Sequence, residues 1–168
     1  MWSRSTGCPF HCFSVVVCRH PITKLWLAVE ENKQRGWWLP GGFVENGDDH
    51  FSTAIKETQE EAGIDITLKG ILRVENTMTR KGGRQRVIFY AEPSDPNQTP
   101  KQEADEESVR AVWMSVDQLQ DKSNCAPPKG LRGTELLDWA KYIEAGGTIY
   151  PMQILTTEKA RIPLGPQK

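Results

Sequence analysis

Three glutamates, Glu57, Glu60 and Glu61, lie within five positions of the 168-residue chain, shortly after a turn that contains Gly41 and Gly42. In a helix, residues at positions i, i+3 and i+4 project from one face, so the three carboxylates would lie together. Like charges at this spacing each cost about 0.2–0.5 kcal/mol in an isolated helix. Carboxylate oxygens are ligands that Mg²⁺ and Mn²⁺ prefer. The pattern indicates either a solvated acidic face or a divalent-metal site.

The element that must carry these glutamates is predicted as a helix over residues 49–62. Asp48 or Asp49 lies near its start, where a carboxylate favours the positive end of the helix dipole, and Gly63 ends it. One face repeats at helical spacing and is predicted to be buried. It consists of Phe51, Ala54, Ile55, Thr58 and Ala62. The glutamates lie on a separate stripe, turned from this face by about 100° or more.

The segment LPGGFVENGD comes directly before this acidic helix. Pro40, Gly41 and Gly42 give a tight turn in which the backbone can approach a ligand closely. A glycine turn followed by an acidic stripe favours the metal-site interpretation over the solvated face.

The spacing resembles the Nudix box, written G-x5-E-x7-R-E-U-x-E-E-x-G-U, where U is aliphatic. The positions that match outright are Gly42, Glu57, Glu60, Glu61, Gly63 and Ile64. Three positions depart from the pattern, because Asp48 stands for Glu, Lys56 for Arg and Thr58 for an aliphatic residue. The segments GWWLPGG and AVWMSVDQL also resemble Nudix segments, so the resemblance extends over residues 12–145.

This resemblance implies an α/β fold, a Nudix-type α/β/α sandwich with a mixed β-sheet. It implies a metal-dependent pyrophosphohydrolase, in which water attacks phosphorus and cleaves a diphosphate bond in a nucleoside diphosphate linked to another group. Mg²⁺ or Mn²⁺ is the implied cofactor. The implied metal site consists of Glu57, Glu60, Glu61 and Gly42.

The predicted catalytic set adds Lys56 and Glu107 to the three glutamates. In the family the box arginine is thought to pair with carboxylates, and Lys56 keeps its charge but loses the planar fork. Glu107, at the end of a polar loop over residues 92–107, is the candidate base or extra ligand, with Glu106 and Glu103 behind it. The alternative for these loop carboxylates is simple solvation.

Substrate selection is predicted to come from outside the box. Four basic residues surround Gly82 and Gly83 and form either a phosphate-binding turn or a solvated hairpin tip; they are Arg80, Lys81, Arg84 and Arg86. Trp37 and Trp38 offer an indole to stack on a base, with one of the two expected to be core or lid packing. The predicted substrate-binding set is Arg84, Arg86, Trp37 and Gly41.

Three functions remain open from the sequence. The first is hydrolysis of a nucleotide sugar, ADP-ribose or a modified nucleoside triphosphate. The second is hydrolysis of dinucleoside or diphosphoinositol polyphosphates, since ETQEEAGI is similar to the box of diadenosine tetraphosphate hydrolases. The third is a weakly active or non-catalytic nucleotide-binding module, in which Lys56 and Asp48 mark lost activity. The intact glutamate triplet argues against the third.

The rest of the chain is predicted as one domain over residues 12–162, with an N-terminal extension at 1–11 and a flexible tail at 163–168. Apolar patterning predicts strands over residues 12–18, 24–30, 64–78, 87–92 and 108–114. The first two are predicted to form a hairpin, and the third is predicted to be one long strand or two broken near Gly70. A helical turn is predicted after Ser115, a surface loop over 124–133, and a helix capped by Thr134.

Composition and charge limit the partners. The chain has 21 basic and 22 acidic residues and a net charge of −1, which argues against broad capture of nucleic acid or an anionic membrane. No apolar run approaches the roughly 20 residues of a membrane-spanning helix. Arg4 before an apolar stretch faintly imitates a signal peptide, but no small-residue cleavage site follows. A cytoplasmic protein with a small nucleotide or polyphosphate substrate is expected, and a homodimer is left open.

The four cysteines are too few for a disulfide scaffold in a chain of this length. A zinc site built from Cys8, His11, Cys12 and His20 is an alternative, but it lacks paired CxxC spacing. Free or buried thiols are the better interpretation.

Overall fold

The computed structural model describes residues 8–80 and 82–161. The predicted tail at 163–168, Lys81 and most of the predicted extension at 1–11 lie outside the described residues. The strands are β1 (Phe10–Cys18), β2 (Trp26–Glu31), β3 (Gly36–Trp38), β4 (Gly41–Phe43), β5 (Ile66–Thr79), β6 (Gly82–Pro93) and β7 (Ser108–Met114). The helices are α1 (His50–Ala62), α2 (Val116–Ser123), α3 (Glu135–Glu144) and the 3₁₀ helix η1 (Met152–Ile154).

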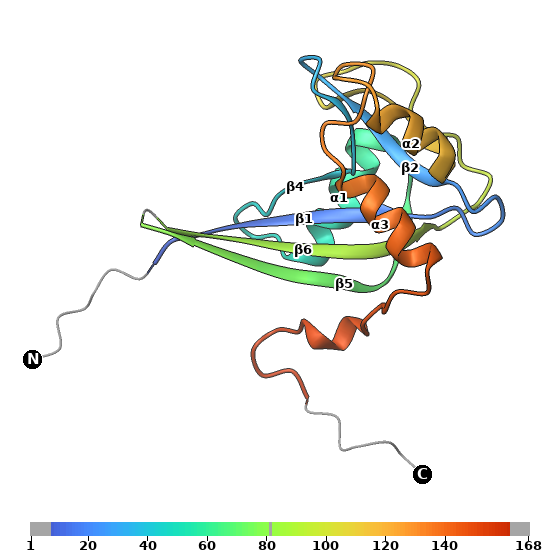
Figure 1. Ribbon diagram of the computed structural model, residues 1–168. Helices are drawn as coiled ribbons and strands as arrows, with labels where there is room; N and C mark the ends of the chain where they lie inside the picture. Colours follow the sequence, from blue (N-terminus) through green and yellow to red (C-terminus); the bar gives the residue numbers. More distant parts are fainter. Residues whose placement is uncertain (1–7, 81, 162–168) are drawn as a thin grey trace, which may run out of the picture.

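The strands form two sheets (Figure 1). The larger has the order β4-β1-β6-β5, and the smaller has the order β3-β2-β7. β1 and β6 are parallel and the other strand pairs are antiparallel, so the larger sheet is mixed, as predicted. β5 and β6 form a long hairpin that extends beyond the body of the molecule together with the start of β1 (Figure 1).

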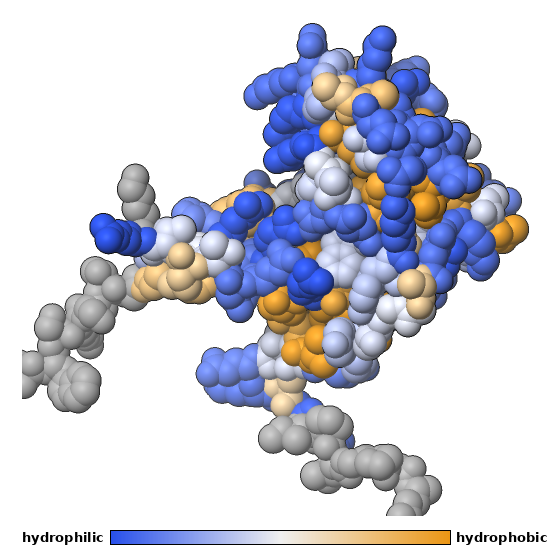
Figure 2. All heavy atoms as spheres, in the orientation of Figure 1, coloured by the Kyte–Doolittle hydropathy of each residue, from blue (hydrophilic) through white to orange (hydrophobic). Residues whose placement is uncertain are grey.

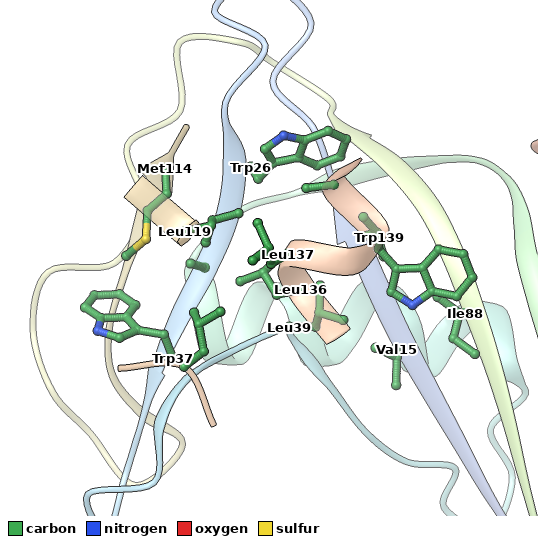
Figure 3. Close-up of a cluster of buried hydrophobic side chains, with 14 of the residues drawn as sticks. Val15, Trp26, Trp37, Leu39, Ile88, Met114, Leu119, Leu136, Leu137 and Trp139 are labelled. Carbon is green, nitrogen blue, oxygen red and sulfur yellow. The ribbon is translucent and has the colours of Figure 1, made fainter. Parts of the chain in front are cut away.

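The central strand β1 is covered on both faces. Side chains alternate along a strand, so Val15 and Val17 join the core cluster that contains α3, whereas Val16 joins the cluster that contains α1. Helices therefore lie on opposite faces of the sheet (Figure 1), which confirms the predicted α/β/α sandwich. Figure 3 shows the α3-side cluster, where Leu136 and Leu137 pack near Leu39.

The predicted hairpin between the first two strands is wrong. β1 pairs with β4 and β6, whereas β2 pairs with β3 and β7. Among the described residues, the pairing between the two segments is an isolated bridge from Trp26 to Arg19, which lies just after β1. A Pro-marked turn between two apolar runs is compatible with a hairpin or with a crossing between sheets, and local sequence does not distinguish them. Of the two alternatives predicted for the third strand, the structure shows one long strand, β5, with a register shift against β6 between Leu68 and Gly70.

Two helix starts differ in their capping. Ser115 accepts a hydrogen bond from Gln118 N and caps α2 as predicted. Thr134 occupies the cap position of α3, but its hydroxyl donates to the Asp138 carboxylate, so the predicted side-chain cap is wrong. None of the helices in the described part of the chain combines the length and apolarity that a membrane crossing requires.

Candidate active site

α1 is fixed at both ends by local interactions. The Asp49 carboxylate accepts from Ser52 N at 2.8 Å while Ser52 Oγ accepts from Asp49 N at 3.0 Å, which completes a capping box. Gly63 ends the helix in the left-handed region with φ 66°, and its N–H donates to Gln59 O at 2.8 Å. The predicted buried face is correct for Ala54, Thr58 and Ala62.

The burial of two residues on that helix differs from the predicted face. Ile55 was predicted to be buried but is 42% exposed, whereas Thr53 is buried. Helical spacing gives the direction of a face but not its width, so residues at its margin are the ones that shift.

Glu61 is tied to the glycine turn. Gly41 N donates to Glu61 Oε2 at 2.9 Å. Gly41 has φ 156°, and a Cβ there would collide with the backbone of Ser14 on β1. Only glycine lets β4 lie this close to β1 while its N–H faces the helix carboxylate.

Glu57 lies against the next residue of the same turn. A Cβ at Gly42 would collide with the Glu57 carboxyl group. The Glu57 carboxylate therefore occupies the space that a side chain at position 42 would fill. Glu57 and Glu61 both lie against the backbone of β4.

The two carboxylates are held where ionisation is unfavourable. Burial raises the pKa of Glu57 to about 7, with the negative charge of Glu60 contributing further. Burial also raises the pKa of Glu61 to about 8 despite the Gly41 hydrogen bond, and repulsion from Glu57 adds to the shift. A bound cation would offset both the burial and the mutual repulsion that disfavour the ionised carboxylates.

Glu60 faces a neighbouring groove of about 560 Å³ rather than the glycine turn. The groove is lined by Gln59, Glu60, Gly63, Lys101, Asp105, Glu106 and Glu107. Glu107 is exposed there, and its charge contributes to the raised pKa of both Glu57 and Glu61. The predicted loop carboxylate thus lies within electrostatic reach of the glutamate stripe.

Lys56 does not grip the glutamate triplet. Its Nζ donates to Glu45 Oε2 at 3.0 Å on the surface, and this contact raises the pKa of the lysine. The Lys56 cation therefore pairs with a loop carboxylate outside the glutamate stripe and does not hold the stripe in the way predicted for the box arginine.

A polar cleft of about 410 Å³ opens beside Glu61. Its lining residues are Phe13, Ser14, Val15, Glu31, Arg35, Trp38, Gly41, Gly42, Glu61, Arg84, Arg86, Arg132 and Glu135. The cleft combines four guanidinium groups with the glycine turn, so it can receive an anionic ligand next to the carboxylates.

The two predicted phosphate-binding arginines differ in their surroundings. Both lie on β6 rather than in a flexible turn, so that part of the prediction is wrong. Arg86 is held by both carboxylate oxygens of Glu135, and its Nε lies 3.0 Å from Glu75 Oε2. Arg84 lies over the Phe13 ring at 4.4 Å and has no carboxylate partner among the described residues. Arg84 is the cation that remains available to a ligand.

The tryptophan pair is resolved by burial. Trp37 is 3% exposed and packs in the core near Met114 and Leu119 (Figure 3), so its predicted contact with substrate is corrected to core packing. Trp38 lines the cleft, with the Arg132 guanidinium 5.3 Å from its ring centroid. Consecutive residues of a strand point to opposite faces, so the two indoles lie on opposite sides of β3.

Three cleft residues had no signal in the sequence. Glu31 is buried, and its Oε1 atom accepts from Arg132 Nη1 at 2.8 Å and lies 3.4 Å from Arg35 Nη2. These residues come from β2, the β2–β3 turn and the loop before α3. Only the tertiary fold brings them together, so no spacing rule could have found them.

The residues present fit a hard divalent cation. Within residues 8–80 and 82–161, no group of three or more His, Cys, Asp or Glu side chains is arranged to hold a metal ion. Mg²⁺ commonly uses one or two carboxylates and fills its remaining positions with water and phosphate oxygens. Glu57 and Glu61, partly buried against the backbone of Gly41 and Gly42, supply such a partial set. The alternative zinc site near His20 is not formed, since that ring bonds Pro96 O and packs on Trp113.

The segment of the chain that matches a family model contains nearly all of these residues. A family model described as the NUDIX domain matches residues 11–132, which include α1, the glycine turn and most of the cleft. The chain belongs to the Nudix family. A Nudix hydrolase from Nitrosomonas europaea has the same fold, with a TM-score of 0.70 and 20% identity over 89% of this chain and 98% of that one.

Two curated relatives share the Nudix segment. The chain is 31% identical over 86 residues to the asymmetrical bis(5'-nucleosyl)-tetraphosphatase of Rattus norvegicus, covering 49% of this chain and 57% of the rat protein. It is 34% identical over 90 residues to the 8-oxo-dGDP phosphatase NUDT18 of Homo sapiens, covering 52% of this chain and 27% of the human protein. The chain therefore spans less than two thirds of either relative.

Proposed function

We propose that this Nudix protein is a divalent-metal-dependent pyrophosphohydrolase that cleaves a diphosphate bond in a nucleoside diphosphate linked to another group. The observation that carries the proposal is the pair of carboxylates, Glu57 and Glu61, buried against Gly41 and Gly42 with their pKa values raised. Such a pair opposes its own ionisation, and Lys56 forms its ion pair with Glu45 rather than with either carboxylate.

The roles of the residues follow from their positions. Glu57 and Glu61 would hold Mg²⁺ or Mn²⁺, and Glu60, which faces the adjoining groove, would add negative charge beside the ion. A divalent cation bound there supplies charge neutralisation on the diphosphate oxygens and acidifies the attacking water. Glu107, exposed at the groove, is the proposed base that accepts the proton of that water.

The cleft is the proposed site for the rest of the substrate. Arg84 would bind a phosphate oxygen, while Trp38 offers an aromatic surface to a base. We propose a cytoplasmic enzyme acting on a nucleotide sugar, ADP-ribose or a nucleoside triphosphate. Among the described arginines that line the cleft, Arg84 alone lacks a carboxylate partner, which supports a second candidate, a dinucleoside or diphosphoinositol polyphosphate whose additional phosphate reaches Arg84.

The decisive test is substitution of the carboxylate that contacts the turn. Glu61→Gln keeps the shape of the side chain but removes its charge. We expect turnover to fall by at least about 100-fold, because a catalytic metal loses a ligand. Phosphate release from a panel of nucleotides, measured with Mg²⁺ and with Mn²⁺ and with a coupled phosphatase to reveal diester cleavage, gives the readout.

The matched control is Glu158→Gln, which removes the same charge from an exposed residue that lines neither the cleft nor the groove. It should leave turnover within about twofold, as is usual for a solvated carboxylate. Near-normal turnover in a folded Glu61→Gln variant would show that the metal assignment is wrong. A wild-type chain that binds nucleotide but hydrolyses none of the panel would instead favour the non-catalytic module.

A further inference from the structure

The outer edge of β5 is open along most of its length. On its inner side β5 pairs with β6 from Ile66 to Thr79. On its outer side the described residues provide one bridge, in which Ile71 and Tyr150 exchange backbone hydrogen bonds of 2.9 and 2.8 Å. The far end of the β5–β6 hairpin extends past the body of the molecule (Figure 1). An unpaired edge presents backbone donors and acceptors that another strand can use.

The devices that usually protect such an edge are sparse here. The stretch Val74–Met78 reads VENTM and contains no proline and no lysine, and its single charge is Glu75. Both register shifts in β5 lie before this stretch, between Leu68 and Gly70 and between Ile71 and Arg73. Proline, lysine and bulges are the common means of preventing edge pairing, so this stretch is suited to accept a partner strand.

The same stretch exposes apolar side chains on one face. Val74 is 39% exposed and Met78 is 59% exposed, and their even spacing puts both on the same side of the strand as Asn76. Figure 2 shows pale orange surface along this projecting end of the sheet. On that face, the Asn76 side chain accepts from Gln85 Nε2 at 3.1 Å, which leaves the strand edge uncovered.

A second copy of this chain matches the edge by symmetry. Two antiparallel β5 edges related by a twofold axis at Asn76 would put Val74 opposite the partner's Met78, and Glu75 opposite the partner's Thr77. Each copy then covers the other's apolar residues. A register centred on Glu75 would oppose two like charges, and one centred further toward Ile71 would meet the segment that already pairs there.

We propose that the chain forms a homodimer through antiparallel pairing of its β5 edges, centred on Asn76. The pairing joins the two four-stranded sheets into one continuous sheet. The proposal is independent of the catalytic assignment, because none of Val74–Met78 except Glu75 takes part in an ion pair, and none lines the cleft beside Glu61.

The register makes the proposal testable by charge. The double variant Val74→Lys with Met78→Lys opposes like charges twice across the axis, so the dimer dissociation constant should rise by at least about tenfold. The matched double variant Val74→Lys with Met78→Glu opposes unlike charges in this register and should retain the dimer. A control, Ile22→Lys, places the same change on an apolar residue that is 71% exposed in the turn after β1.

Sedimentation equilibrium of the full chain over a concentration series gives the mass, against a protomer of 19.0 kDa. Circular dichroism confirms that each variant is folded. A dimer in the wild type, the Ile22→Lys control and the Lys/Glu variant, with a monomer in the Lys/Lys variant, supports the proposal. A monomeric wild type, whether or not another segment of the chain covers the edge, overturns it. A dimer that survives in the Lys/Lys variant, or that the Lys/Glu variant also loses, overturns the register.

Discussion

Glu57 and Glu61 are the residues whose surroundings change their chemistry most. Their pKa values rise from an ordinary 4.5 to about 7 and about 8. Between pH 4.5 and 8 the metal-free folded chain therefore binds more protons than the unfolded chain, so its free energy of unfolding falls as pH rises. Below this range both carboxyls are protonated in either state and the penalty is absent.

Metal should reverse this trend. Binding requires the ionised carboxylates, so the apparent affinity for Mn²⁺ should strengthen between pH 6 and pH 8, where Glu57 and Glu61 lose their protons. Thermal melts with and without Mn²⁺ should show a larger stabilisation by metal at pH 8 than at pH 5.5. Glu61→Gln should flatten both curves. Equal stabilisation by metal at the two pH values would contradict the assignment.

Arg84 and Arg86 lie on the same strand, but we expect Arg86 to stabilise the fold and Arg84 to bind substrate. Arg86→Gln leaves Glu135 and Glu75 without their half-buried partner, so we expect a loss of about 1–3 kcal/mol in the free energy of unfolding. Arg84→Gln breaks no ion pair among the described residues and removes only the contact with the Phe13 ring, so it should cost less than about 1 kcal/mol in the free energy of unfolding. It should raise KM by about tenfold or more for substrates with more than two phosphates, since a charge-assisted hydrogen bond is lost. An equal rise in KM for all substrates would exclude a role of Arg84 in binding an additional phosphate.

At the scale of elements, α1 depends on its capping box. Asp49→Ala removes the acceptor of Ser52 N and should cost about 1 kcal/mol, or about 2–4 °C in melting temperature. Asp48→Ala is the matched control, because that carboxylate lies one residue outside the cap and should change stability by less than about 0.5 kcal/mol. Differential scanning calorimetry separates the two. Equal losses would mean that charge near the helix dipole matters more than the hydrogen bond.

The elements also show what sequence could foresee. The helix, its glycine end and the glutamate stripe follow from local periodicity and capping, and these were predicted to within a residue or two. The partners of β1 and β2, the burial of Trp37 and the assembly of Glu31 with Arg132 depend on contacts between distant segments. Such contacts leave no periodic signal, so the cleft is less predictable than the helix beside it.

At the scale of the whole molecule, the fold extends beyond the residues that match the family. The family model ends at residue 132, yet α3 follows it and buries Leu136, Leu137, Trp139 and Ala140 against the sheet. α3 also supplies Glu135, which holds Arg86 at the cleft. The folded domain therefore extends further along the chain than the segment that matches the family model.

A chain that ends at residue 132 should consequently fail to fold. Burial of three large apolar side chains on α3 contributes on the order of 5 kcal/mol, which is comparable to the entire stability of an average domain. A chain that ends at residue 161 retains α3 and should melt within about 2 °C of the full-length protein. Circular dichroism and limited proteolysis of both truncations provide the measurement. Cooperative melting of the shorter chain would show that α3 is an accessory to the site rather than one wall of the core.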